Sequence, residues 1–325
     1  MKKRVVILIA LVSGAINACE LANPSRGLEI NSPVSNTMCS YGFSSTCGRR
    51  LSMEDAHDIQ KLGLPKDGAF FAIYDGHGGQ SVAQCLNKWL CKQVTNGLTD
   101  LQDTKPETIG VLLRKAYQDV DNQILHEIDQ GKIEDSGSTA VTALMLENYC
   151  HLAWCGDSRA LVIRGGKVIQ ATKDHKPNAP AEKERLEAHD GLVIGDRLVG
   201  DGLNISVSRS YGDPTFKKST KNGFIVEPEI ISLELKPRDL IVLACDGLWD
   251  RVSNDDVAIA YDTLSSLDSN SLSIKNFFPD DQPSLTGMNP FLRIVAQSLT
   301  RLAYNRSSSD NISALVVEYQ GEVKQ

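Results

Sequence analysis

The chain has 325 residues, of which 41% are hydrophobic and 23% are charged. This length and composition suit one large globular domain or two small ones, with enough apolar residues to fill a core. The formal net charge is −7, and no basic run follows the first four residues, which disfavours binding to the phosphate backbone of nucleic acids.

The N-terminal segment 1–19 has the layout of a secretory signal peptide, with a basic start, an apolar stretch at Val5–Val12 and a close at Cys19. Its apolar stretch is shorter than the about 20 residues that span a bilayer. Residues 16–19 of this segment, Ile-Asn-Ala-Cys, also loosely resemble a bacterial lipoprotein box, in which Cys19 would be lipidated. We therefore expect an exported protein, or one attached to a membrane only through this segment. The alternative is a cytoplasmic protein that keeps an apolar extension.

Residues 20–38 are rich in Asn, Ser and Pro, which predicts a linker. The eight cysteines include no C-x-x-C pair, which argues against a zinc ribbon. Three of them lie in apolar, strand-like segments and are expected to be buried: Cys150, Cys155 and Cys245. In an exported protein, Cys39 and Cys47 would be candidates for a disulfide.

From Cys39 onward the chain shows strand and helix patterns in close succession. The apolar run Phe70–Tyr74 stops at Asp75 and Gly76, which predicts a buried strand followed by a tight turn. Helical spacing is seen at Ser81–Val94, Ile109–Ile128, Pro180–Ala188, Asp255–Leu264 and Pro290–Tyr304. Further strands are expected at Ala140–Leu146, Cys150–Cys155, Ala160–Arg164, Lys167–Ala171, Phe224–Leu235, Leu240–Cys245 and Ile312–Tyr319.

These elements do not follow the strict strand–helix alternation of a parallel sheet. Two antiparallel sheets with helices packed outside them fit the order better. Residues 266–288 are polar and predict an inserted surface loop.

Acidic residues gather in four segments, which are Arg50–Asp55, Asp75–Gly79, Asp246–Asp250 and Asp310–Asn311. In two of these segments an apolar run ends and an Asp-Gly pair begins, at Asp75 and at Asp246. An aspartate at the end of a buried strand is costly as a bare anion, and two on neighbouring strands would repel each other. A divalent cation resolves both problems, and hard oxygen ligands select Mg²⁺ or Mn²⁺. The following glycine is expected to allow a sharp turn and to bring a carbonyl to the metal.

A single Asp-Gly pair is more often a simple turn. The string Asp75–Gly79, however, is expected by chance in about one in ten thousand chains of this length. His77 is a metal ligand or a proton donor, and the excess of carboxylates favours the donor. Glu54 and Asp55 would point to opposite faces of a strand, so both cannot bind one metal directly. Arg50 forms a surface ion pair or grips a phosphate with its planar guanidinium.

Four further motifs complete a pattern: Gly137–Ala140, Gly156–Arg159, Asp174–Pro177 and Val207–Asp213. Together with the acidic segments, they resemble the metal-dependent protein phosphatase family, also called the type 2C serine/threonine phosphatases. The resemblance covers about Tyr41 to Tyr319 and keeps the family's motif order. It implies an α+β fold with a catalytic domain over residues 39–320. That domain would be a four-layer α-β-β-α sandwich, in which two antiparallel β-sheets are flanked by helices.

The resemblance also implies two divalent cations per subunit, Mg²⁺ or Mn²⁺, in a cleft at one end of the sheets. Asp75 would bridge them, with the Gly76 carbonyl on one cation and Asp246 and Asp310 on the other. The remaining acidic positions would hold metal-bound waters, at Glu54 and Asp55, or a third, weaker cation found in some members, at Asp157 and Asp250.

The implied reaction is hydrolysis of phosphoserine and phosphothreonine in proteins by a metal-activated water, without a covalent phosphoenzyme. Arg50 matches the phosphate-binding arginine and His77 the general acid. Residues 178–198 match a flap that influences substrate choice.

One alternative is a phosphatase-shaped scaffold without turnover, although the metal aspartates are all retained. The other is a different metallohydrolase, acting on nucleic acid or on small phosphorylated metabolites. The acidic charge disfavours the nuclease. Since no extended amphipathic seam is seen, a monomer is expected.

Overall fold

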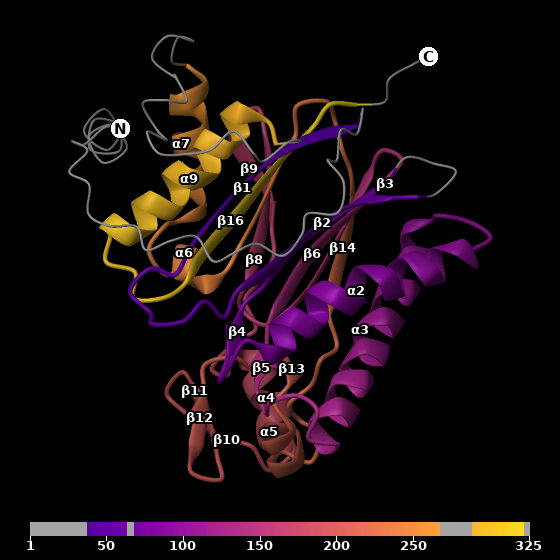
Figure 1. Ribbon diagram of the computed structural model, residues 1–325, viewed down its shortest axis with the longest axis vertical. Helices are drawn as coiled ribbons and strands as arrows, with labels where there is room; N and C mark the ends of the chain where they lie inside the picture. Colours follow the sequence, from indigo (N-terminus) through magenta and orange to yellow (C-terminus); the bar gives the residue numbers. More distant parts are fainter. Residues whose placement is uncertain (1–37, 64–67, 267–287, 322–325) are drawn as a thin grey trace.

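A computed structural model describes residues 38–63, 68–266 and 288–321. The expected signal-like segment 1–19, almost all of the expected linker and residues 267–287 of the expected loop lie outside this part of the chain. Figure 1 shows two sheets packed face to face, with helices α2 and α3 on one outer face and α7 and α9 on the other. Every strand pair within the two sheets is antiparallel. The expected α-β-β-α sandwich is therefore confirmed.

The first sheet contains both the start and the end of the described chain. Its strand order is β1 (Cys39–Thr46), β16 (Ile312–Tyr319), β15 (Leu240–Ala244), β8 (Arg159–Arg164) and β9 (Lys167–Ala171). Its outer face packs against α6 (Asp246–Trp249), α7 (Asn254–Ser265) and α9 (Pro290–Asn305). Helix α7 begins with a reciprocal capping box between Ser253 and Asp256, and Asn289 caps α9.

The second sheet has the strand order β14 (Glu229–Glu234), β7 (Tyr149–Cys155), β6 (Ala140–Leu146), β3 (Gly68–Tyr74) and β2 (Ala56–Leu62). Its outer face is covered by α2 (Ser81–Thr99) and α3 (Pro106–Asp129). Both helices bury one apolar stripe and leave polar residues outside, as the helical spacing in the sequence predicts. Within the described ranges, no helix is long and apolar enough to cross a membrane.

Strand β3 shows why the central strands are apolar throughout. Alternate side chains of a strand point to opposite faces of its sheet. Phe70 and Tyr74 pack with the helices, whereas Phe71 and Ile73 pack between the sheets. Because both faces are covered, all seven residues of the strand are buried. The same alternation runs through β15 and β16, whose side chains pack in turn against the helices and between the sheets. The ends of these strands are therefore held by close packing on both faces.

A smaller unit lies below the sandwich in Figure 1 and holds the expected flap. It contains α4 (Pro180–Ala188), β10 (Leu192–Ile194), β11 (Arg197–Gly200), β12 (Leu203–Ile205) and α5 (Pro214–Ser219). Leu186, Leu198, Phe216 and Phe224 give this unit a core of its own. A three-stranded sheet of very short strands joins it to the sandwich: β13 (Tyr211–Gly212), β5 (Gly137–Ser138) and β4 (Gly76–His77).

Two expectations are corrected by these elements. The strand expected at Phe224–Leu235 exists only as β14, because Phe224 packs into the flap core and Pro228 has no backbone N–H to donate to a ladder. The candidate disulfide is also wrong. Cys39 and Cys47 are separated by the extended strand β1, which puts them roughly 25 Å apart, far beyond the reach of a disulfide. Cys150, Cys155 and Cys245 are buried, as expected.

Candidate metal centre and active site

The two Asp-Gly pairs meet at one end of the sandwich. Asp75 follows β3 of the second sheet, and Asp246 lies just beyond β15 of the first sheet. The two aspartates thus come from opposite sheets that pack face to face, and not from neighbouring strands of one sheet. One carboxylate oxygen each of Asp75, Asp157 and Asp246 lies within 4.8 Å of the other two.

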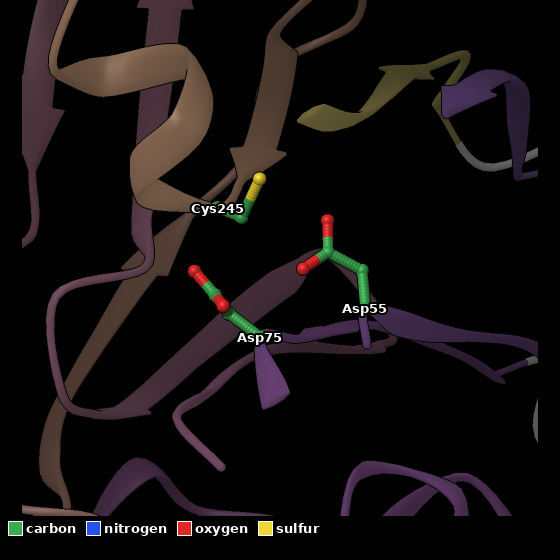
Figure 2. A group of neighbouring side chains, drawn as sticks. All are labelled: Asp55, Asp75 and Cys245. Carbon is green, nitrogen blue, oxygen red and sulfur yellow. The ribbon is translucent and has the colours of Figure 1, made fainter. Parts of the chain in front are cut away.

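A second group shares Asp75 and extends the cluster toward the first sheet. Figure 2 shows Asp55, Asp75 and Cys245 converging from three segments, and their ligand atoms also lie within 4.8 Å of one another. Ser313 Oγ donates to Asp55 Oδ2 at 2.6 Å. The other oxygen, Asp55 Oδ1, is buried without a hydrogen-bond partner among the described residues. An orphaned buried carboxylate oxygen in a group with another carboxylate and a thiol is suited to a cation.

The electrostatics of the cluster point the same way. Burial raises the pKa of Asp75 well above its usual range, and the nearby charges of Asp246 and Asp55 raise it further. The pKa of Asp246 is raised by burial and then by the charges of Asp157 and Asp250. Burial likewise raises the pKa of Asp55 to about 6, although a hydrogen bond from Ser313 opposes the shift. These carboxylates repel one another, and divalent cations with hard oxygen ligands would relieve that repulsion.

Glycine is required after each of the two aspartates, but for a different reason from the sharp turn that was expected. Neither Gly76 nor Gly247 has a positive φ, so neither is needed for a sharp turn. A Cβ on Gly76 would lie 2.4 Å from the carbonyl oxygen of Glu54, and a Cβ on Gly247 would lie 1.9 Å from that of Asn311. Glycine is required at both positions because another backbone segment passes directly over it. These close contacts bring the loops of Glu54 and Asn311 onto the cluster.

Asp157 is the cluster member with a cationic partner. It is 2% exposed, and Lys176 Nζ donates to its Oδ2. Burial raises the pKa of Asp157, whereas the Lys176 charge lowers it. Asp250 is exposed at the end of α6. Its charge is close enough to Asp246 to add to the rise in the pKa of Asp246 that burial and Asp157 cause. The two residues matched to a third cation are thus near Asp246, with one of them neutralised by a lysine.

The loop before β2 is organised by Asn311. Its Nδ2 donates to the carbonyl oxygens of Cys47 and Ser52 at 3.0 and 2.9 Å, and its Oδ1 accepts from Glu54 N at 2.8 Å. Arg50 on this loop donates through Nη2 to Asp310 Oδ2 at 2.6 Å. The predicted phosphate-binding guanidinium is therefore placed beside a predicted metal ligand.

Glu54 and Asp55 precede β2 and do not lie on a strand. The expected alternation of their side chains therefore does not apply. Asp55 faces Asp75, whereas Glu54 Oε2 accepts a hydrogen bond from Gly79 N at 3.4 Å. Glu54 thus ties this loop to the segment that carries His77.

His77 lies on β4, two residues beyond Asp75, and belongs to neither of the two ligand groups found among the described residues. Its Nε2 is 2.7 Å from Asp213 Oδ2. Burial lowers the pKa of His77, but the charge and the hydrogen bond of Asp213 outweigh it and raise the pKa above its ordinary value. This arrangement fits the proton donor better than the metal ligand.

Three residues of this site had no role in the sequence analysis: Lys176, Asp213 and Asn311. Lys176 and Asp213 lie in motifs that the sequence shows, but their partners are distant in the chain. The His77–Asp213 contact joins residues 136 positions apart. The Asn311 contacts reach back by 257 to 264 positions. Such pairs depend on sheet register, which residue spacing does not reveal.

Comparisons with known proteins identify the family. The family described as "Protein phosphatase 2C" matches residues 39–312. "Probable protein phosphatase 2C 55" of Oryza sativa subsp. japonica is 31% identical over 282 residues, which cover 86% of this chain and 66% of the rice protein. "Protein phosphatase 1A" of Homo sapiens is 36% identical over 236 residues, which cover 67% of this chain and 59% of the human protein. The chain spans between 50% and 68% of the length of four plant relatives.

Solved structures share the fold. The crystal structure of serine-threonine phosphatase 2C from Toxoplasma gondii superposes with a TM-score of 0.68. The match covers 88% of this chain and 96% of that one, at 22% sequence identity. At this identity the likeness supports the architecture, and the chemistry has to be argued from the residues of this chain.

Proposed function

The chain belongs to the protein phosphatase 2C family, and from that premise we propose that it hydrolyses phosphoserine and phosphothreonine in proteins. The observation that carries the proposal is the group Asp75, Asp157 and Asp246, whose oxygens from opposite sheets lie within 4.8 Å of one another. Two further contacts support it: Arg50 donates to Asp310 from the loop that Asn311 organises, and His77 lies on β4, two residues beyond Asp75. A two-cation phosphatase needs these groups in one place.

The proposed cofactors are Mg²⁺ or Mn²⁺, two per subunit, because the donor set is almost entirely carboxylate. Asp75 would be shared, since it belongs to both ligand groups. Asp310, Asp246 and the Gly76 carbonyl would complete the two sites, and Glu54 and Asp55 would act through waters. Asp157 and Asp250 would hold a weaker third cation. Such cations supply the Lewis acidity that activates a water for attack on phosphorus.

The residues of the chain perform the remaining work. Arg50 would bind the phosphoryl oxygens, for which its planar guanidinium is suited once Asp310 is engaged elsewhere. His77 would protonate the departing serine or threonine oxygen. No covalent phosphoenzyme is proposed, because Cys245, the thiol of the described cluster, is fully buried, and burial raises its pKa well above its usual range, which disfavours the nucleophilic thiolate.

The proposed substrates are phosphoproteins, and the chain is proposed to act as a monomer. The test is release of phosphate by the full chain from a phosphothreonine peptide, a sugar phosphate and single-stranded DNA, with Mn²⁺ and then with EDTA. We expect Mn²⁺-dependent turnover on the peptide, its loss in Asp75→Asn, and its retention in the exposed control Asp262→Asn. Faster turnover on the sugar phosphate would favour a metabolite phosphatase. No turnover by a folded protein that binds Mn²⁺ would favour a scaffold.

A further inference from the structure

The carboxylate of Asp213 is the hydrogen-bond partner of the His77 ring. Asp213 Oδ2 lies 2.7 Å from His77 Nε2, and the Asp213 side chain is 9% exposed, whereas that of His77 is 31% exposed. We propose that Asp213 is the positioning residue of the proton donor, and that it fixes the imidazole so that Nδ1 faces the leaving oxygen. This inference rests on the proposed role of His77 and adds a residue and a ring atom to it.

The backbone holds Asp213 in an unusual conformation. Its φ and ψ are 50° and 52°, in the left-handed region that Asp tolerates better than most residues. Its N–H donates to Ser136 O at 3.1 Å, and Ser210 Oγ donates to the same Oδ2 that meets His77. The carboxylate is therefore aimed by two independent contacts, one from the main chain and one from a buried hydroxyl.

A buried ion pair between α3 and α5 holds the segment that carries Asp213. Lys217 Nζ is 2.7 Å from each oxygen of Asp121, and Asp121 Oδ1 also accepts from Gly212 N at 2.9 Å. Asp121 is 2% exposed and Lys217 is 8% exposed. Breaking such a pair leaves an uncompensated buried charge, which strongly opposes movement of α5 away from α3. The residue before Asp213 is thus fixed to the sandwich.

Gly137 explains why the two side chains can meet. It pairs with His77 of β4 and with Gly212 of β13, so it lies directly beneath the contact. A Cβ at this position would lie 2.1 Å from Asp213 Oδ2 and 2.2 Å from His77 Nε2. Any side chain there would therefore wedge the pair apart. The bare Cα of the Gly137–Ala140 motif is needed for this contact.

The orientation has a chemical consequence. A protonated imidazole carries a hydrogen on each nitrogen, and Asp213 takes the one on Nε2. The hydrogen on Nδ1 is left for the leaving group. In hydrolysis the attacking water forms the new P–O bond and the P–O bond to the threonyl oxygen breaks. That oxygen takes the Nδ1 proton, while the water's own proton passes to solvent, from which His77 is reprotonated.

The test uses the dependence of the rate on the leaving group. Threonine is a poor leaving group that needs a proton, whereas nitrophenolate departs without one. We compare kcat of the Mn²⁺-loaded full chain on a phosphothreonine peptide and on p-nitrophenyl phosphate. In Asp213→Asn and in Gly137→Ala, the ratio of peptide to nitrophenyl kcat should fall about tenfold or more, as expected for loss of a positioned acid. KM for the peptide should change less than twofold, since neither residue binds the phosphate.

Three further variants make the result decisive. Asp135→Asn removes a nearby exposed carboxylate and should leave the ratio unchanged. Ser210→Ala removes only a buried hydroxyl, so it should lower the ratio less than Asp213→Asn, and it serves if Asp213→Asn fails to fold. His77→Gln should lower the ratio at least as much. A ratio that falls in His77→Gln but not in folded Asp213→Asn or Ser210→Ala would overturn the positioning role alone. A ratio unchanged in His77→Gln would overturn the proposed proton donor itself.

Discussion

Arg50 Nη2 lies 2.6 Å from Asp310 Oδ2, so the group proposed to bind phosphate contacts a group proposed to bind metal. The Arg50 side chain is 53% exposed and that of Asp310 is 31% exposed. A pair as exposed as this contributes only about 0–1 kcal/mol to stability. The guanidinium can therefore exchange Asp310 for a substrate phosphate at low cost once cations neutralise the carboxylate.

Replacing Arg50 tests this exchange. Lysine keeps the charge but loses the planar pair of donors that matches two phosphoryl oxygens. We expect Arg50→Lys to raise KM for a phosphothreonine peptide about tenfold, with a smaller change in kcat. The matched control is Arg49→Lys, because Arg49 donates to Ser308 O and lies over the ring of Tyr304. An equal rise in KM in both variants would contradict the assignment of Arg50.

Metal removal should reverse the effect of one substitution on stability. Without cations, Asp246 is repelled by Asp157, Asp250 and Asp310. In EDTA, Asp246→Asn should therefore raise Tm by a few degrees relative to the wild type. In excess Mn²⁺ the same variant should have the lower Tm, because it has lost a ligand and gains less from binding. Melting curves of both proteins in both buffers give the comparison, with Asp262→Asn as the exposed control. The same order of Tm in both buffers would contradict a metal role for Asp246.

The positions of the main strands could be predicted because hydrophobic pattern and burial agree there. The apolar runs that end at Asp75 and Asp246 are β3 and β15, and both have covered faces on either side. Local pattern did not show that the two strands belong to opposite sheets. That depends on which strands pair across more than a hundred residues, as β1 with β16.

The features that could not be predicted depend on contacts between segments that are distant in the sequence. The glycines Gly76 and Gly247 are required by a backbone segment that comes from a distant part of the chain. The contact of His77 with Asp213 is built on strands of two residues each, which are too short to show a period. The apolar pattern of Phe224–Leu235 suits a strand and the core of the smaller unit equally well. Only the tertiary packing decides which of these residues form the strand.

Lys176 should compete with the proposed third cation for the carboxylate of Asp157. It contacts Asp157, and its own pKa is raised by Asp157 and by the charges of Asp246 and Asp250, although burial opposes the shift. Lys176→Met keeps most of the side-chain volume and removes the charge. We expect calorimetric titration with Mn²⁺ to show the weakest site bound about tenfold more tightly in the variant, because Asp157 becomes available. Lys173→Met, an exposed neighbour, is the control. Unchanged affinity and stoichiometry would contradict the competition.

Asp58 on β2 is a buried acid outside the metal cluster. It is 2% exposed, and neither carboxylate oxygen has a well-formed hydrogen bond among the described residues. Burial raises its pKa from 3.8 to about 7, and the neighbouring Gln60 and Ile59 N–H oppose the shift only in part. The folded state therefore keeps a proton that the unfolded chain has already released above about pH 4.

This difference fixes the sign of a pH effect. Between about pH 4 and 7 the folded state binds more protons at Asp58, so its contribution to stability falls as pH rises, by up to about 1.4 kcal/mol per unit. Above about pH 7 the loss is complete and the contribution is flat. Asp58→Asn removes this titration with little change in volume. We therefore expect Tm of the variant minus Tm of the wild type to be small at pH 5 and clearly positive at pH 8. Asp262→Asn should show no such trend, and an equal difference at both pH values would show that Asp58 does not titrate in this range.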